Sequence, residues 1–229
     1  MKTETTVSFH DIKKYYEVVY KRIFDDKNNF VCDYFIFNDK TEDIQSLEKE
    51  KYKATHDRLT GLYNKDQFYV ETYKILHRNA DVPYCMWCSN IRDFKFVNEL
   101  FGIEKGNEIL LKQADIIKKH AVDGYLYGRV GEDHFVVIAD EATFNEEHLY
   151  ECRETLQNVL SDSVYNVRVC FGIYRTDNMN ESLSFMCDKA SFAVASIKDD
   201  THSFIAYYDD TMLEAAIKYK TIVDEFDDA

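Results

Sequence analysis

Two strand-forming segments joined by a short polar turn constrain this chain more than any other feature. The first segment covers residues 125–130 and the second covers residues 135–139. The turn between them reads Gly131-Glu132-Asp133-His134. Two strands separated by a short turn that contains glycine are typical of a β-hairpin. Because this turn holds two carboxylates and an imidazole, it is also the first place to look for chemistry.

Further blocks of sequence accompany the hairpin. They are Asp57-Arg58-Leu59-Thr60-Gly61-Leu62-Tyr63-Asn64-Lys65, Asn90-Ile91-Arg92-Asp93-Phe94-Lys95-Phe96-Val97-Asn98-Glu99, Phe101-Gly102-Ile103-Glu104-Lys105-Gly106-Asn107-Glu108-Ile109-Leu110, Val169-Cys170-Phe171-Gly172-Ile173 and Asp188-Lys189-Ala190. In this order and spacing the chain resembles the GGDEF family, the diguanylate cyclase domains, whose usual turn reads Gly-Gly-Asp/Glu-Glu-Phe. The resemblance runs from about Asp57 to about Asp210.

The composition limits the classes of function. A chain of 229 residues, 45% of them hydrophobic, can bury one domain of ~170 residues with an appendage. No apolar run approaches the ~20 residues that span a bilayer, and Met1-Lys2-Thr3-Glu4 lacks a signal-peptide pattern, so we expect a cytoplasmic protein without membrane insertion. A net charge of −14 argues against nucleic acid as a partner, whereas a local nucleotide pocket stays compatible with it.

The six cysteines do not predict a disulfide scaffold in a chain of this length. Cys85 and Cys88 have CxxC spacing inside an apolar, strand-like run. Residues three apart on a strand face opposite sides, which suits neither chelation nor a disulfide. We therefore predict buried structural cysteines.

The chain divides by pattern into four parts. Residues 1–40 contain a β-hairpin, 41–56 a charged linker helix, 57–210 the GGDEF-like domain and 211–229 an acidic C-terminal helix. The hairpin resembles the last strands of a PAS sensor domain, and a fragment of such a domain and an unrelated hairpin are both open. For the linker, Ile44 and Leu47 suit a parallel coiled coil, but Lys51 interrupts the seam, so a solvated helix is equally open.

The remaining periodicities predict an α/β sandwich with one central sheet. Thr60 is the expected N-cap of the first helix. We expect helices at 65–77, 94–100, 105–120, 145–160, 182–197 and 210–226, and strands, besides the hairpin, at 84–90, 166–174 and 203–207. The resemblance implies a five-stranded, mainly antiparallel sheet like that of nucleotidyl cyclases and polymerase palm domains.

The resemblance also implies a reaction. Family members join two GTP molecules into cyclic di-GMP, with one half-site on each subunit of a dimer and Mg²⁺ on the phosphates. By position, the first metal carboxylate falls on Asn90, the second is kept as Asp133, and the following Glu falls on His134. An amide brings no charge and imidazole suits Mg²⁺ poorly, so the metal site is degraded. Asp93 is either a solvated helix cap or a rescue ligand.

The nucleotide-binding positions are partly kept. Phe94, Lys95, Asn98 and Gly131 match the family, whereas Asn107 replaces the aspartate that pairs with guanine. Ala195 stands where the family has a phosphate-binding lysine, and the Arg-x-x-Asp product-inhibition site, expected near residues 122–125, is absent. Glu132 replaces the second glycine; two like charges ~4 Å apart repel by roughly 4 kcal/mol at an effective dielectric near 20, an upper limit for its effect on a triphosphate.

Arg92 replaces the second acid of the Asp-x-Asp block, two residues from Asn90. Two interpretations are open. Its guanidinium either stands in for the missing metal beside phosphates, or it pairs with a surface carboxylate such as Glu99.

Together these features predict a degenerate GGDEF domain without cyclase activity. Its expected role is regulatory, as a GTP-binding or dimer-forming module. A slow cyclase that uses Asp133 and Asn90, and a purely structural scaffold, are the alternatives. The C-terminal stretch from Tyr207 to Glu214 resembles a linker to an EAL phosphodiesterase domain.

Overall fold

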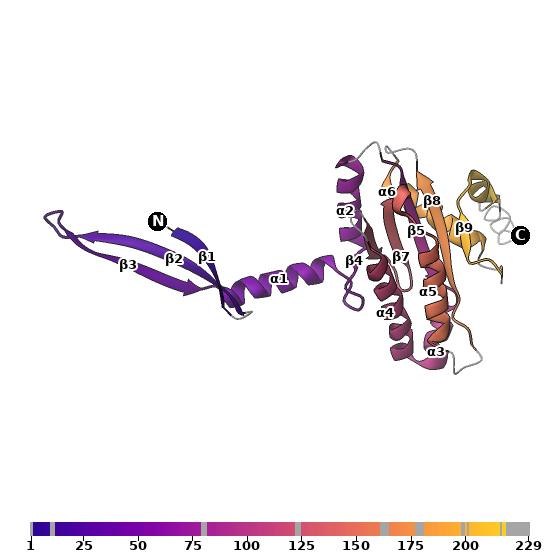
Figure 1. The fold of residues 1–229 in the computed structure, drawn as a ribbon, viewed down its shortest axis with the longest axis horizontal. Helices are drawn as coiled ribbons and strands as arrows, with labels where there is room; N and C mark the ends of the chain where they lie inside the picture. Colours follow the sequence, from indigo (N-terminus) through magenta and orange to yellow (C-terminus); the bar gives the residue numbers. More distant parts are fainter. Residues whose placement is uncertain are drawn as a thin grey trace, which may run out of the picture. The chain divides into compact units, whose positions relative to one another are not determined.

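The computed structural model describes residues 2–9, 12–78, 82–121, 125–160, 165–176, 181–197, 200, 202–215 and 217–218. It divides into two compact units, Met1–Ala54 and Thr55–Ala229, which are described separately (Figure 1). The end of the predicted C-terminal helix, residues 219–229, and most of the predicted product-inhibition position, residues 122–124, lie outside the described residues. No helix of the described part combines the length and the apolar character needed to cross a bilayer.

The first unit is an antiparallel sheet followed by a helix. Its elements, in sheet order β1-β2-β3, are β1 (Lys2–Phe9), β2 (Ile12–Phe24) and β3 (Phe30–Asp39), and then α1 (Thr41–Thr55). In the β2–β3 turn the Asp25 carboxylate accepts backbone N–H bonds from Lys27 and Asn29, both at 2.8 Å. The expected two-stranded hairpin is thus part of a three-stranded sheet. The first strand was missed because its sequence, Lys-Thr-Glu-Thr-Thr-Val-Ser-Phe, is strand-forming through threonine and has few apolar residues.

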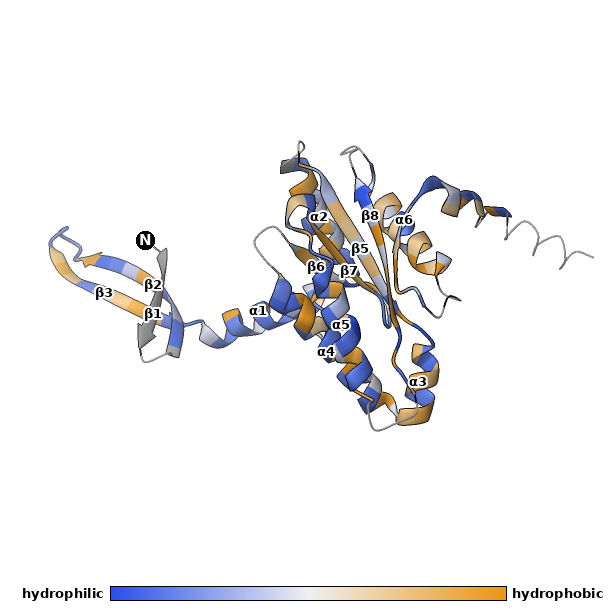
Figure 2. Cartoon of the chain, turned by 45° about the vertical axis from the view of Figure 1, so that its right-hand side comes forward, coloured by the Kyte–Doolittle hydropathy of each residue, from blue (hydrophilic) through white to orange (hydrophobic). Residues whose placement is uncertain are grey.

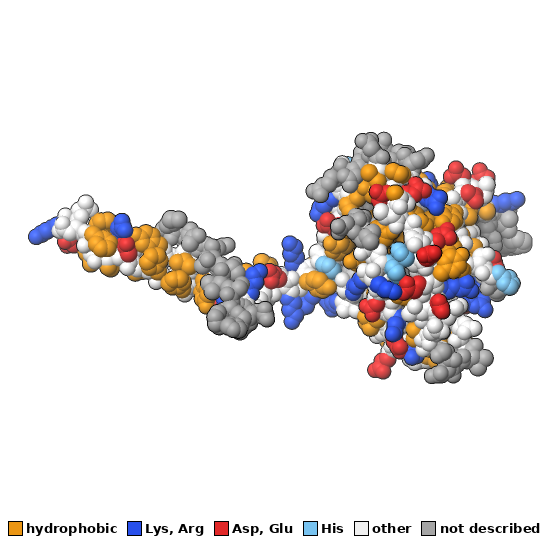
Figure 3. Space-filling view, in the orientation of Figure 1, with side chains coloured by type: hydrophobic (Ala, Val, Ile, Leu, Met, Phe, Trp, Pro, Cys, Tyr) orange, Lys and Arg blue, Asp and Glu red, His pale blue; other side chains and the backbone are white. Residues whose placement is uncertain are grey.

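Apolar side chains lie at the surface of this first unit. The large exposed ones on β2 and β3 are Ile23, Phe24, Phe30, Val31, Phe35, Ile36 and Phe37. Figure 3 shows hydrophobic side chains at the surface of this unit, on the left of the view. Helix α1 contributes no buried residue, and its Leu47 is 70% exposed. The first unit therefore carries more apolar surface than its own core can cover.

The second unit is built on a six-stranded sheet. Its order is β4-β6-β7-β5-β8-β9. The strands are β4 (Tyr63–Asn64), β5 (Tyr84–Ile91), β6 (Leu126–Arg129), β7 (Phe135–Asp140), β8 (Val169–Thr176) and β9 (Ile205–Tyr207). The four inner strands pair antiparallel, and only the outer pairs β4–β6 and β8–β9 are parallel. The predicted α/β sandwich is confirmed, with one strand more than expected, because the two-residue β4 is too short to leave a pattern.

Helices cover both faces of this sheet. They are α2 (Lys65–Arg78), α3 (Phe94–Phe101), α4 (Ile103–His120), α5 (Glu147–Asn158) and α6 (Leu183–Ser196), with a 3₁₀ turn, η1 (Glu141–Thr143). A further helical segment begins at Asp210. The predicted N-cap of α2, Thr60, was wrong, because the Asn64 side chain accepts the bond from Gln67 N–H at 3.0 Å.

Alternation along β5 divides the core into two layers. Cys85, Trp87 and Ile91 pack with α4 and α5, whereas Met86 and Cys88 pack with α2 and α6. The strand is buried on both sides, which explains its continuous apolar sequence (Figure 2). Cys85 and Cys88 are buried free thiols on opposite faces, as predicted, and burial raises the pKa of Cys85 to about 12.

Candidate active site

The β6–β7 turn lies beside the end of β5. The ladder pairs Arg129 with Phe135 across the hairpin and Ser89 with Phe135 across the central pair. A bond from Val130 N–H to the His134 carbonyl, 2.9 Å long, closes the turn. The sheet register therefore brings Asp133 and His134 to Asn90, as the sequence predicted.

The Asp133 carboxylate is buried, with 7% of the residue exposed, and it is fully engaged by donors. Its Oδ2 accepts from Ile91 N–H at 2.8 Å and from Asn90 Nδ2 at 3.1 Å. Its Oδ1 lies 3.2 Å from His134 Nδ1. A carboxylate offers about four lone-pair positions, so three of them are used inside the protein. The neighbouring charge also fixes the Asn90 amide, whose oxygen would be repelled by Asp133.

His134 bridges the two other site residues. Its Nε2 lies 3.1 Å from Asn90 Nδ2, which can only donate, so this nitrogen accepts and Nδ1–H faces Asp133. The hydrogen bond with Asp133 raises the pKa of His134, burial lowers it, and the charges of Asp133 and Glu132 raise it further; the net direction is upward. In this arrangement a neutral imidazole, with Nδ1–H toward Asp133, stands where the resemblance implied a second acid.

These residues do not fit Mg²⁺. The ion needs anionic oxygens at ~2.0–2.1 Å in near-octahedral geometry. Here Asn90 presents an amide nitrogen to Asp133, the one buried carboxylate among the described residues. Asp93 is exposed; it begins α3 in the left-handed region at φ 54°, and its side chain makes no capping bond, so it neither rescues the metal nor caps through its carboxylate. Within the described ranges no group of three or more His, Cys, Asp and Glu side chains is placed to hold a metal ion.

Arg129 fastens the turn from the other side. It donates to the Glu132 carbonyl through Nη2 at 2.5 Å and through Nε at 3.2 Å, and its Nη1 lies 3.0 Å from Asp57 Oδ1. Asp57 also accepts from the backbone N–H and hydroxyl of Thr60. The contact between Arg129 and Asp57 was not predicted, because no local sequence pattern joins residues this far apart. The side chain of Glu132 itself is exposed, consistent with its swinging into solvent.

Arg92 lies beside Asn90 and His134 in the wall of one pocket. The predicted ion pair between Arg92 and a surface carboxylate such as Glu99 was wrong. Its Nη2 donates to the carbonyls of Ile197 at 2.8 Å and Asp200 at 3.0 Å, while its Nε is buried without a partner. The cause is the C-terminal end of α6, which passes within reach of the strand end. A pocket of about 630 Å³ opens here, and its lining includes Asn90, Arg92, His134, Ser191 and Ala195. Ala195, where the resemblance implied a phosphate-binding lysine, belongs to the wall of this pocket.

The residues expected to read guanine lie on α3 and α4. Asn98 Oδ1 is buried without a hydrogen-bond partner. A Cβ added to Gly106 would lie 1.8 Å from this atom, so glycine makes room for the Asn98 side chain. Asn107 follows directly and is half-buried, Phe94 is buried and Lys95 is exposed. Asn98 Oδ1 therefore lies against Gly106 and has no hydrogen-bond partner among the described residues.

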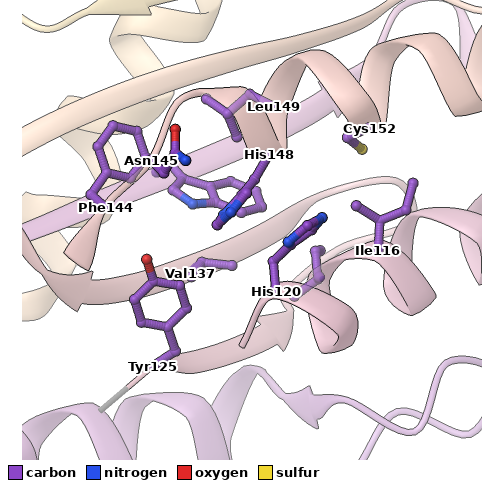
Figure 4. A pocket seen from close by; sticks show the side chains of 11 residues that line it. Ile116, His120, Tyr125, Val137, Phe144, Asn145, His148, Leu149 and Cys152 are labelled. Carbon is purple, nitrogen blue, oxygen red and sulfur yellow. The ribbon is translucent and has the colours of Figure 1, made fainter. Parts of the chain in front are cut away.

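A second pocket, lined mostly by apolar side chains, lies between α4 and α5. Figure 4 shows the rings of His120 and His148 beside each other above Val137. The rings stack at 3.9 Å, and His120 bonds to Glu151 at 2.6 Å. Burial and the His120 charge lower the pKa of His148. Nothing links this pair to Asp133, so we assign it to packing between the helices.

The sheet order and the acidic turn at the end of its central strand define a nucleotidyl-cyclase-like, palm-type domain. Residues 54–203 match the family described as "Diguanylate cyclase, GGDEF domain". This is more than half of the chain, and the chain therefore belongs to the GGDEF family.

Relatives agree with this assignment. Over 105 residues the chain is 33% identical to "Diguanylate cyclase DgcM" of Escherichia coli (strain K12), covering 45% of this chain and 26% of DgcM. It is 29% identical over 101 residues to "Diguanylate cyclase" of Vibrio cholerae serotype O1, covering 43% of this chain and 32% of that protein. The chain thus matches about a quarter to a third of the length of these curated relatives.

Solved structures support the fold. The coiled coil and GGDEF domain of DgcB from Caulobacter crescentus, in complex with c-di-GMP, superposes with a TM-score of 0.60 at 19% identity. The match covers 72% of this chain and 92% of that one. At this identity the similarity concerns the fold alone.

Proposed function

We propose that this chain is a degenerate GGDEF domain in cyclic di-GMP signalling, which binds a guanine nucleotide such as GTP without converting it. One observation carries the proposal: the Asp133 carboxylate is bonded to Ile91 N–H and Asn90 Nδ2 and lies against His134. Phosphoryl transfer depends on positioning and on metal that neutralises the phosphate charge. A carboxylate held by three internal donors is a poor ligand for that metal.

The charges around Asp133 support the same conclusion. Of the four acids that the family resemblance places here, Asn90, Arg92 and His134 replace three. The remaining negative charge is compensated by internal donors rather than kept for a cation. We therefore propose no Mg²⁺ cofactor.

Binding of a nucleotide without turnover is supported by Asn98. Its buried, unpartnered Oδ1 suits the amino or imino N–H groups of guanine, and leaving such an atom unpaired costs free energy. We further propose a homodimer, a location between sensor and output domains such as PAS and EAL, and no product inhibition by cyclic di-GMP. These are proposals for a longer protein, since the chain matches only part of its relatives.

Two assays test the proposal. With GTP and either Mg²⁺ or Mn²⁺ we expect no cyclic di-GMP by chromatography, and calorimetry should detect GTP binding that weakens at least tenfold in Asn98→Ala. Asn158→Ala, an exposed asparagine on α5, is the matched control and should leave binding unchanged. Product formation that disappears in Asp133→Ala would instead establish the slow cyclase. Absence of binding heat would establish the structural scaffold.

A gain-of-function variant sharpens the test. Combining Asn90→Asp, Arg92→Asp, Glu132→Gly and His134→Glu removes the two side-chain donors from Asp133, leaves the bond from Ile91 N–H, and restores the acids. Turnover in this variant, and none in the original chain, would identify the lost metal site as the cause of inactivity. If the original chain turns over GTP as fast as the variant, the proposal is wrong.

A further inference from the structure

A polar pocket lies on the other side of Arg92. The C-terminal half of α5, the start of β8 and the segment before β9 form it, with a volume of about 600 Å³ open to solvent. Its lining includes Arg92, Arg153, Gln157, Asn166, Arg168 and His202.

Contacts fix the guanidinium groups of two of the three pocket arginines, Arg92 and Arg153. Arg92 donates to two backbone carbonyls, and its Nε is buried with no partner. The Arg153 guanidinium stacks on Phe204 with 4.2 Å between its centre and the ring. Arg168 directly precedes β8, and its backbone carbonyl accepts from Arg92 N–H at 2.8 Å. None of the three forms an ion pair with a carboxylate of the described residues.

Three other arginines of the described residues differ from them. Arg22, Arg129 and Arg175 each lie within 3.3 Å of a carboxylate, on Asp33, Asp57 and Glu141. The one described acid in the pocket wall, Asp200, uses its Oδ1 to accept from His202 N–H at 2.8 Å. In a chain of net charge −14, three converging guanidinium groups form a local excess of positive charge.

We propose that this pocket binds a small oligophosphate anion, of the size of a diphosphate, without a metal ion. Planar guanidinium groups bind phosphate oxygens in pairs, and the amides of Gln157 and Asn166 can donate further bonds. Arg153 and Tyr150 cover the Phe204 ring, which leaves polar and charged groups as the main feature of the lining. The pocket therefore recognises the phosphates rather than a base.

The pocket adjoins the candidate active site. Arg92 and Cys170 belong to the walls of both cavities. An anion bound to Arg92 in the oligophosphate pocket would therefore act on a side chain that also lines the cavity beside Asn90. Because Arg92 serves both, Arg153 and Arg168 are the residues that test this pocket alone.

The test is calorimetric titration of the full chain with inorganic pyrophosphate in EDTA at fixed ionic strength. We expect one binding event that weakens at least tenfold in Arg168→Gln and in Arg153→Gln. Arg153→Lys keeps the positive charge but loses the planar guanidinium group, so its affinity for pyrophosphate should lie between that of the original chain and that of Arg153→Gln. Arg58→Gln removes the same charge from an exposed arginine outside the pocket and should change affinity less than twofold.

Further arms separate this site from the active site and from unfolding. His134→Ala should leave pyrophosphate affinity within twofold, because His134 lines only the neighbouring cavity. Thermal melts identify variants that lose structure. If Arg153→Gln is one of them, the affinity of Arg168→Gln for pyrophosphate decides the test. No heat in the original chain, equal loss in Arg58→Gln, or loss in His134→Ala but not in Arg168→Gln would each overturn the proposal. Pyrophosphate binding does not depend on GTP binding, so the two proposals can fail separately.

Discussion

At the level of single residues, Arg129 joins parts of the chain 72 positions apart. It contacts the carboxylate of Asp57 at the entry to the domain and the carbonyl of Glu132 in the turn. Both side chains are largely buried, with 13% and 24% exposed for Arg129 and Asp57. Hydrogen bonds to charged groups in such places contribute ~1.5–3 kcal/mol each, more than a surface ion pair does.

Replacing Arg129 by Met should therefore lower the free energy of unfolding by about 2 kcal/mol at pH 7. Burial raises the pKa of Asp57, but the bonds from Thr60 and Arg129 outweigh it and the net pKa is lowered. This stabilisation is present above the unfolded pKa of ~3.9 and is lost as pH falls through the lowered value. The difference between the original chain and Arg129→Met, measured by urea denaturation, should shrink in acid.

The matched control is Arg175→Met, whose half-exposed ion pair with Glu141 spans 3.3 Å. It should cost less than about 1 kcal/mol, since exposed ion pairs contribute little. Equal losses in the two variants would show that the Arg129 contacts have no special weight.

Residues of the site were predictable where a strand end or a turn fixes their place. Asn90, Asp133 and His134 lie at the end of β5 and in the β6–β7 turn, and they meet because β5 pairs with β7. The donors to Asp133 were not predictable, since the bond from Ile91 N–H depends on how the turn settles against β5. The partners of Arg92 lie 105 and 108 residues away at the end of α6, so no local pattern could reveal them.

At the level of elements, helices and inner strands were predicted to within a few residues because their periodicity is strong. The short or polar strands β1 and β4 were missed, since their pairing rather than their pattern creates them. The contact between α6 and β8 is another such feature. A Cβ on Gly172 would lie 2.0 Å from the Ala190 carbonyl oxygen and 2.5 Å from Val194 N.

Gly172→Ala should accordingly destabilise the domain by at least about 2 kcal/mol, because backbone atoms cannot yield as a side chain can. The expected fall in melting temperature is roughly 4–8 °C for a domain of this size. Gly131→Ala is the control: its nearest neighbour is the His134 side chain at 3.2 Å, which can move. Because α6 also walls the pocket beside Asn90, Gly172→Ala should weaken GTP binding as well. A melting temperature equal to that of Gly131→Ala would contradict this packing argument.

At the level of the whole molecule, the two units differ in how much of their apolar surface is buried. All the buried core clusters lie in the second unit. The first unit exposes Phe35 and Phe37 on one face of β3 and Ile36 on the other. Three strands with uncovered apolar faces gain little stability on their own, and apolar patches of this kind mark interaction surfaces.

We expect a second copy of the chain to cover this sheet, so sedimentation should show a homodimer. Phe35→Asp combined with Phe37→Asp should yield monomers, since charges in an apolar interface are costly to desolvate. Leu47→Asp on α1 is the discriminating control, because Leu47 is 70% exposed at the position where a coiled coil would close. If Leu47→Asp dissociates the dimer and the β3 variant does not, α1 is the interface; if the unaltered chain sediments as a monomer at every concentration, no self-association occurs.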